Sequence, residues 1–276
     1  MFRPARSVPA ALALLALAST HLAAQSVADI VDRMYDSYER QAEGVDNYTL
    51  VQSVMGTETT SYFEKEVVEG RPVFMLRDSD VGGFSFGLGS EDAGVGDLFL
   101  WGDELVEHGR YAGREQIGSS AVHVLAVDDM SQLEIAQPST PDEMEFEPKT
   151  ARIFVDDALM VPRRIEFVGD ALTDTGPHEV TVRVDLENYL PIESLLIPYR
   201  TVVHIEGLGA AMDPEMRAQL EEMERQLAAL PPDQRETMER MLGPQMEQVR
   251  QMMAGGGDAM TIEVTVVDVV INAGRE

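Results

Sequence analysis

The sequence contains no cysteine and only five histidines, and both scarcities narrow the chemistry open to it. Without cysteine the chain has no disulfide, no thiol nucleophile and no cysteine that a lipid anchor could modify. The histidines stand singly, and the sequence has neither an H-E-x-x-H motif nor a cysteine/histidine cluster for a metal. Phosphate-binding and dinucleotide-binding fingerprints are missing as well. The residues therefore predict a non-enzymatic protein with no metal and no cofactor.

Basic residues are also scarce, and long apolar runs are missing. There are 21 Lys and Arg against 49 Asp and Glu, which gives a formal net charge of −28. Such a chain repels nucleic acid and anionic membrane surfaces, so a nucleic-acid partner is not expected. Nowhere does an apolar run approach the roughly 20 residues of a membrane helix, so an integral membrane protein is not expected either.

The first residues have the pattern of a secretory signal peptide. Arg3 and Arg6 precede an apolar stretch at 8–18, and small residues follow up to a plausible cleavage site after Ala24. We predict a signal peptide at 1–24, a periplasmic location, and one domain over 25–276.

The remaining periodicity predicts one helix followed by many strands. The stretch SVADIVDRMYDSYERQAEG has apolar residues on one helical stripe, and Gly44 ends it. From Asp46 the period changes to two, and about ten short strands follow at hairpin-like spacing, with a glycine-rich mobile loop at 79–96 and an acidic loop at 137–148. We predict an α+β fold in which a curved antiparallel sheet forms an unclosed β-barrel covered by helices.

A helical hairpin rich in methionine is predicted at 211–254, between the last two strands. In its first arm Met or Leu recurs every three or four residues, and half of the 16 methionines lie between 212 and 253. Core packing of two helices explains this pattern as well as an adaptable lid does. Methionine repacks readily against varied apolar partners, which suits a lid over a hydrophobic ligand.

One stretch matches a catalytic motif by letter. Residues 83–87, GFSFG, fit G-x-S-x-G, and Ser85 could be completed by Asp156 and His178 in the chain order of a hydrolase triad. The motif needs a strand before it and a helix after it, whereas a glycine-rich loop follows here. A serine esterase is therefore the least favoured hypothesis.

Three stretches resemble the bacterial outer-membrane lipoprotein-sorting proteins of the LolA type: VVEGRPVFMLR at 67–77, WGDELVEHGRY at 101–111 and ENYLPIESLLIPYRTVV at 187–203. The resemblance implies an unclosed barrel, covered by helices, around an apolar cavity for acyl chains. It also implies that Arg71, beside Pro72, forms hydrogen bonds to the lid region and controls opening. The long hairpin at 211–254 departs from the short carriers of the family.

By this resemblance the chain is expected to be a periplasmic carrier or chaperone in lipoprotein transport and to bind the acyl chains of lipoproteins or lipid. A membrane-bound donor or acceptor protein is a further expected partner. The alternative is a regulatory or interaction module on the same fold. No catalytic residue is expected. The predicted ligand-binding residues are Arg71, Pro72, Phe74, Leu76, Phe84, Phe86, Phe99, Trp101, Met212, Met216, Leu220 and Met223.

Overall fold

The computed structural model describes most of the chain between the predicted signal peptide and the last three residues. The described residues are 26–54, 56–68, 70–79, 101–133, 145–173, 176–207, 225 and 259–273. The predicted signal peptide at 1–24, nearly all of the glycine-rich loop at 79–96 and all but one residue of the hairpin at 211–254 lie outside them.

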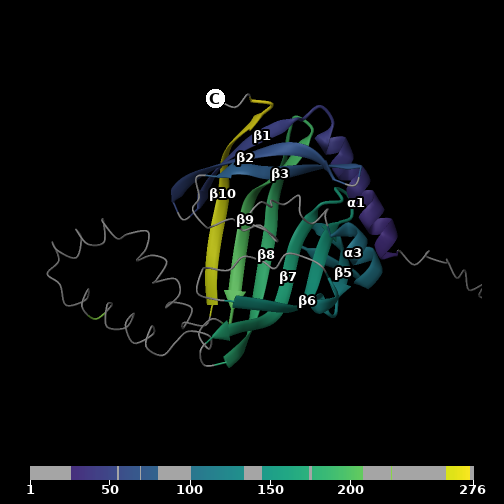
Figure 1. Cartoon of the computed structure of the whole chain (residues 1–276), viewed down its shortest axis with the longest axis vertical. Helices are drawn as coiled ribbons and strands as arrows, with labels where there is room; N and C mark the ends of the chain where they lie inside the picture. The colour runs from purple at the N-terminus through teal and green to yellow at the C-terminus, as the bar shows by residue number, and fades with distance from the viewer. Residues whose placement is uncertain are drawn as a thin grey trace, which may run out of the picture.

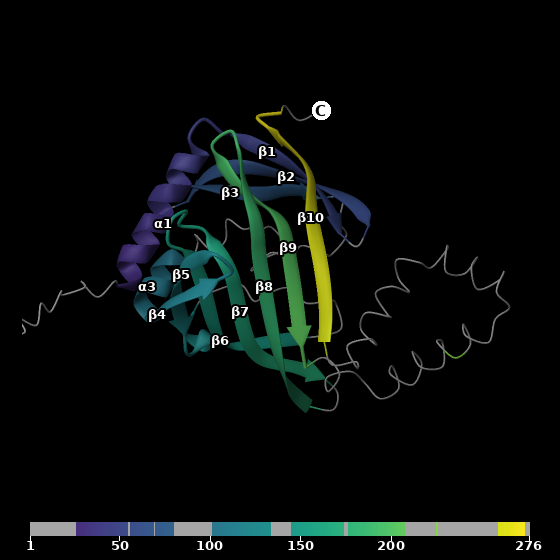
Figure 2. The same cartoon turned by 180° about the vertical axis from the view of Figure 1, so that it is seen from behind.

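Ten strands in the described ranges form one antiparallel sheet (Figures 1 and 2). The strand order is β3-β2-β1-β10-β9-β8-β7-β6-β5-β4. The strands are β1 (Asn47–Val54), β2 (Thr57–Val68), β3 (Arg71–Ser79), β4 (Arg110–Ile117), β5 (Ser120–Val127), β6 (Glu145–Asp156), β7 (Pro162–Thr173), β8 (Gly176–Ile192), β9 (Leu195–Glu206) and β10 (Ala259–Ile271).

Two meanders make up this sheet, and one long-range pairing joins them. Strands β1 to β3 follow one another, as do β4 to β10, and β1 then pairs with β10, for example Leu50 with Val269. Strands β9 and β10 also pair with each other, so the segment 207–258 connects two neighbouring strands of the sheet. The edge strands β3 and β4 do not pair with each other, and the curved sheet is unclosed.

Helix α1 (Val27–Ala42) lies on one side of the sheet, and its bounds follow from local chemistry. Ser26 caps its first turn in a reciprocal capping box with Asp29. Gly44, at a φ of +76°, occupies the left-handed conformation just past the end of the helix. Two shorter helices, α3 (Gly102–His108) and the 3₁₀ turn η1 (Met130–Gln132), complete the helices of the described part.

The two faces of the sheet differ in polarity because side chains alternate along each strand. We call the face that carries Ile153, Ile165 and Val184, which lie side by side on β6, β7 and β8, the inner face. Residues of α1 pack into one core cluster with Ile153 and Ile165. The opposite, outer face carries Arg152, Glu166 and Arg183 in the same register.

The structure confirms the predicted sheet and its open edges and corrects two details. A helical cover over the whole inner face is not seen within the described residues. Strand β6 begins at Glu145, inside the predicted acidic loop at 137–148, because Phe146 is buried at 3% exposure and pairs with Ala171. Asp156, the possible triad acid, is the last residue of β6, directly before the β6–β7 turn, and is only 4% exposed.

Candidate functional site

Two helices stand at the gap between the open edges of the sheet. Helix α1 contacts α3, β3 and β9, and α3 contacts β5, next to the edge strand β4. Figures 1 and 2 show both helices at the side where the sheet fails to close. The gap thus brings edge strand β3, α1 and α3 together, and Arg71 is one of the residues that meet there.

Arg71 links three elements at this gap, and we call Arg71, Tyr35 and Asp103 the edge junction. The Arg71 guanidinium carbon lies 3.6 Å from the centre of the Tyr35 ring on α1, within cation–π range. Its Nη1 atom is 3.8 Å from Oδ1 of Asp103 on α3. Burial raises the pKa of Tyr35, although the nearby Arg71 charge opposes the change, so the phenol is neutral at pH 7.

The first residue of α3 packs closely on Tyr35 of α1 beside this junction. A Cβ atom at Gly102 would overlap the hydroxyl and ring of Tyr35, so a larger residue here would require the Tyr35 side chain to move. The preceding residue, Trp101, is 5% exposed, and its ring stands edge-on to Phe167 with centroids 6.2 Å apart. The start of α3 is therefore seated between α1 and the inner face of β7.

An aromatic cluster continues from the junction along β1 to β3. Tyr48 stacks on Phe63 at 4.7 Å and meets Phe74 edge-on at 5.1 Å. The backbone N–H of Phe74 donates to the hydroxyl of Tyr38 on α1 over 3.2 Å. Burial, with a smaller contribution from Tyr38, raises the pKa of Tyr48 far above its usual value. Leu76 is partly buried beside this cluster.

The predicted ligand-binding residues fall into three sets. Arg71 lies in the edge junction, and Trp101 beside it. Phe74 and Leu76 belong to the aromatic cluster, and Pro72 pairs with Val67 at the start of the edge strand. The remaining seven lie outside the described residues: Phe84, Phe86, Phe99, Met212, Met216, Leu220 and Met223. Ligand contact stays a prediction for all twelve.

Sequence reasoning did not name Tyr35 and Tyr38 as site residues. Both lie in α1, on the apolar stripe predicted for the first helix, where large side chains usually belong to the core. The sequence did carry one signal for these two residues. A buried tyrosine hydroxyl needs a hydrogen-bond partner, so two tyrosines on the buried stripe indicate polar contacts with other elements. The partners come from β3 and α3, and only the fold brings these elements to α1.

The middle of the inner face carries an apolar cluster made of strand residues alone, which we call the strand cluster. It lies on β8, β9 and β10, and its five buried members are between 1% and 8% exposed. Neither α1 nor α3 contributes a residue to it. The members are Val184, Leu186, Val203, Ile262 and Val264.

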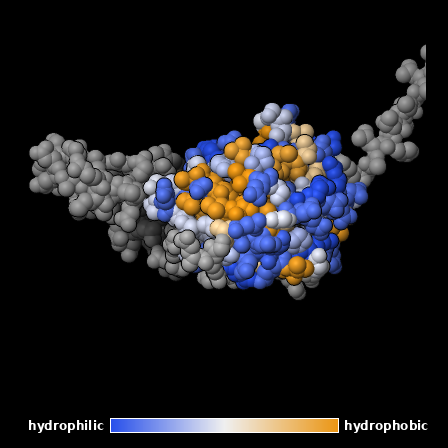
Figure 3. All heavy atoms as spheres, turned by 90° about the horizontal axis from the view of Figure 1, so that it is seen from above, coloured by the Kyte–Doolittle hydropathy of each residue, from blue (hydrophilic) through white to orange (hydrophobic). Residues whose placement is uncertain are grey.

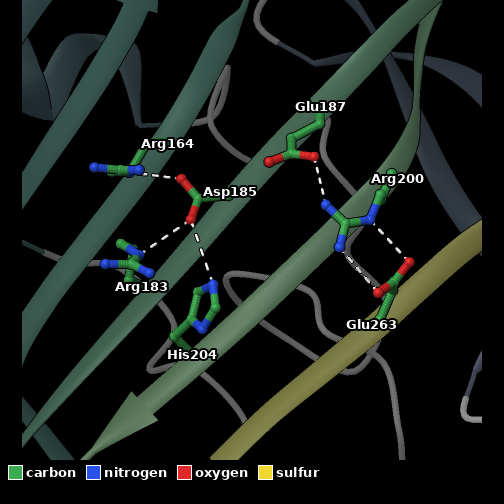
Figure 4. Close-up of polar contacts among 7 residues, drawn as sticks. All are labelled: Arg164, Arg183, Asp185, Glu187, Arg200, His204 and Glu263. Atoms are coloured by element: carbon green, nitrogen blue, oxygen red, sulfur yellow. Dashed lines mark hydrogen bonds and ion pairs between the residues drawn. The ribbon is translucent and has the colours of Figure 1, made fainter. Parts of the chain in front are cut away.

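The outer face of the same three strands is charged (Figure 4). Asp185 accepts from Arg164 at 2.6 Å and from Arg183 at 3.0 Å, and His204 lies 3.7 Å away. In a second group, Arg200 binds Glu187 at 2.6 Å and Glu263 at 2.8 Å. These groups satisfy one another. Asp185 is only 7% exposed, whereas Arg200, Glu187 and Glu263 are each more than a third exposed and lie at the surface.

The described residues give the serine esterase hypothesis no support. Oδ1 of Asp156 accepts from the backbone N–H groups of Ala158 and Leu159 at 2.9 and 3.0 Å, and Oδ2 accepts from Arg163. Through these bonds the carboxylate stabilises the β6–β7 turn. Ser85 lies outside the described residues. Among the described residues no group of three or more His, Asp or Glu side chains is arranged to hold a metal ion.

Within the described ranges no helix has the length and apolar content that crossing a membrane requires. No protein-family model matches the chain, and no curated protein matches it at a significant level.

Solved structures do show a likeness. The chain is similar to a DUF1329 family protein from Desulfovibrio piger (9% identity, 91% of this chain and 93% of that chain, TM-score 0.39). It is similar to a putative outer membrane lipoprotein-sorting protein domain from Vibrio parahaemolyticus (11% identity, 90% and 93%, TM-score 0.39). A third is a LolA superfamily protein from Nitrosomonas europaea (11% identity, 89% and 94%, TM-score 0.33).

Proteins of the lipoprotein-sorting and LolA type, which the sequence resembles, are thus among the structures to which the chain is similar. The function proposed below is carried by the residues of this chain alone.

Proposed function

We propose that this chain is a non-enzymatic periplasmic carrier that binds acyl chains of lipoproteins or lipids over the inner face of its sheet. The observation that carries the proposal is the strand cluster. It is an apolar area on β8, β9 and β10 to which α1 and α3 contribute no residue. A single sheet that is apolar on one face needs a second layer there. In the loaded carrier, hydrocarbon forms that layer.

The energetics of acyl binding suit such a surface. Each buried methylene contributes about 0.8 kcal/mol, so a few methylenes give useful affinity. The methionine-rich segment leaves the sheet after Glu206 and returns at Ala259, at paired ends of the strands that bear the cluster. In the empty carrier this segment is the proposed cover, and its unbranched side chains suit repeated exchange with a ligand.

The edge junction is the proposed control point for loading. Arg71 precedes the glycine-rich segment in the chain, and Asp103 follows it. Their contact therefore joins the parts of the chain on either side of that segment. Opening the gap between the sheet edges separates Arg71 from Tyr35 and Asp103. The Arg71 and Asp103 side chains are 37% and 76% exposed, so their ion pair breaks and re-forms more easily than core packing.

A fluorescent fatty-acyl probe tests the carrier directly. We expect saturable binding by delipidated protein, and a tryptophan at Ile205, a partly buried neighbour of the strand cluster, should weaken it at least about tenfold by filling the apolar surface. The matched control is Glu206→Trp, on the opposite face of the same strand, which should bind as the wild type does. Circular dichroism checks that both variants are folded. Failure of the wild type to bind the probe would overturn the proposal.

An interaction module on the same fold is the second candidate, and exposed apolar residues favour it. Val267 and Val270 of β10 are 51% and 42% exposed. In the end-on view of Figure 3, apolar side chains gather in one area of the surface. If the module is the main function, Val267→Ser with Val270→Ser should abolish a cross-linked protein complex and leave acyl binding unchanged. The carrier proposal expects acyl binding to depend on Ile205 and not on these two valines.

A further inference from the structure

A buried histidine lies where α1, edge strand β4 and the β6–β7 turn meet. His123 on β5 is fully buried, at 0% exposure. Its Nε2 atom is 2.7 Å from Oδ1 of Asp157 in the turn, and its Nδ1 atom is 3.4 Å from the hydroxyl of Tyr111 on β4. Neither the proposed acyl surface nor the edge junction uses this group.

Further hydrogen bonds tie the same turn to α1. Arg33 donates to the backbone oxygen of Asp157 over 3.3 Å, and Ser37 donates to the backbone oxygen of Leu159 over 3.0 Å. Arg114 of β4 donates to Oδ1 of Asp157, the oxygen that also contacts His123. We call His123, Tyr111, Arg114, Asp157 and Arg33 the histidine junction. It attaches the first half of α1 to the sheet through the turn.

The charges around His123 oppose its protonation. Neutral imidazole is fully satisfied here, with Nε2–H donating to Asp157 and Nδ1 accepting from Tyr111. The charged groups facing it are one carboxylate, Asp157, and two guanidinium groups, those of Arg114 on β4 and Arg33 on α1. A proton would therefore add a third positive charge to a buried site with one negative charge. Burial lowers the pKa of His123, and Asp157 only partly offsets this.

We propose that the histidine junction is an acid-sensitive lock that holds α1 to the β6–β7 turn at neutral pH and loosens it in mild acid. The sign follows from linkage: the folded-state pKa lies below the ordinary histidine value of about 6.5. The neutral ring stabilises the closed junction above that value, and this contribution is lost as the pH falls from about 6.5 towards the folded-state pKa.

Hydrogen exchange measured by mass spectrometry on the full mature chain tests the lock. After correction for intrinsic rates, exchange in peptides from α1 and the β6–β7 turn should accelerate by up to about tenfold per pH unit below 6.5, the limit for one proton. Peptides from β8 and β9 should keep their protection. Equal acceleration everywhere would mean that acid lowers global stability only, and it would overturn the proposal.

Two variants separate His123 from other titrating groups. His123→Gln retains an N–H donor near the Nε2 position without titrating, so it should abolish the acid response of α1. The matched control is His204→Gln on the outer face, where burial and Arg183 also lower the histidine pKa. This control should respond as the wild type does. An unchanged response in His123→Gln would contradict the lock.

A measurement on the wild type covers the case in which His123→Gln fails to fold. In NMR spectra the His123 ring should titrate below pH 6.5, and amide signals of Arg33 and Ser37 should shift with the same midpoint. Amide signals of α1 that do not follow the His123 titration would overturn the proposal.

Discussion

The inner and outer faces of β8, β9 and β10 come from alternate residues of the same strands, yet different forces stabilise them. On the inner face Val184, Val203 and Ile262 are nearly inaccessible. On the outer face Glu187 and Arg200, both more than a third exposed, bind partners of opposite charge. Apolar burial gives large stabilisation that depends on shape, whereas exposed ion pairs contribute little and mainly keep the surface soluble. Ligand binding is therefore expected on the inner face.

The largest effect should come from truncating an inner-face side chain. Phe167→Ala removes a fully buried ring that contacts Trp101, and we expect a loss of about 3–5 kcal/mol in the free energy of unfolding. The adjacent outer-face change, Glu166→Ala, removes weak pairs to Arg152 and Arg164 and should cost about 1 kcal/mol or less. Urea denaturation measures both, and equal losses would contradict the distinction between the faces.

Asp156 tests whether the burial of a charged group, rather than its charge itself, determines how much it contributes to the free energy of unfolding. Burial opposes ionisation of this carboxyl, but bonds from Leu159, Arg163 and Ala158 outweigh it and lower its pKa. Its ionised form therefore stabilises the fold above the ordinary aspartate pKa, near 4, and this contribution is lost as the pH falls through the lower folded-state value.

We expect Asp156→Asn to cost about 1–3 kcal/mol at pH 7 and to flatten the loss of stability in acid. Denaturation curves between pH 2 and pH 7 measure this. Asp128→Asn, at an exposed aspartate paired with Arg110, is the control and should change neither quantity much. An acid profile of Asp156→Asn identical to the wild type would refute this account.

Gly102 tests the packing of α3 at the edge of the inner face. Gly102→Ala places a methyl group on the Tyr35 ring, and we expect a loss of about 1–3 kcal/mol. In a double-mutant cycle, adding Tyr35→Ala should relieve the overlap, so the two losses should sum to more than the loss in the double variant. Additive losses would show that the two residues do not conflict. Glu107→Ala on the exposed side of α3 is the control.

The smallest effect is expected on the outer face. Arg200 binds Glu187 and Glu263, but all three side chains are more than a third exposed. Arg200→Ala should leave the denaturation midpoint almost unchanged at high salt and lower it slightly at low salt, because salt screens exposed pairs. A large loss that persists at high salt would assign this network a structural role.

Much of the fold could be predicted from the sequence because its signals are local. The capping box at Ser26 and Asp29 and the glycine at 44 mark the ends of α1 within a few residues. Alternation and turn residues likewise locate the strands, and the hairpin order of β6 to β9 follows from short connections. Strand β6 was placed too late because an acidic sequence concealed the buried Phe146.

Only the tertiary structure determines which residues meet at the edge junction and at the histidine junction. The pairing of β1 with β10 joins residues more than 200 positions apart, and no local pattern specifies it. Arg71 was predicted by resemblance, but its contacts with Tyr35 and Asp103 depend on how α1 and α3 sit at the open edges. The sequence around His123 predicts a strand and gives no sign of a polar site. The groups around His123 come from β4, α1 and a distant turn. Periodicity shows which side of an element is buried, and only packing shows what it is buried against.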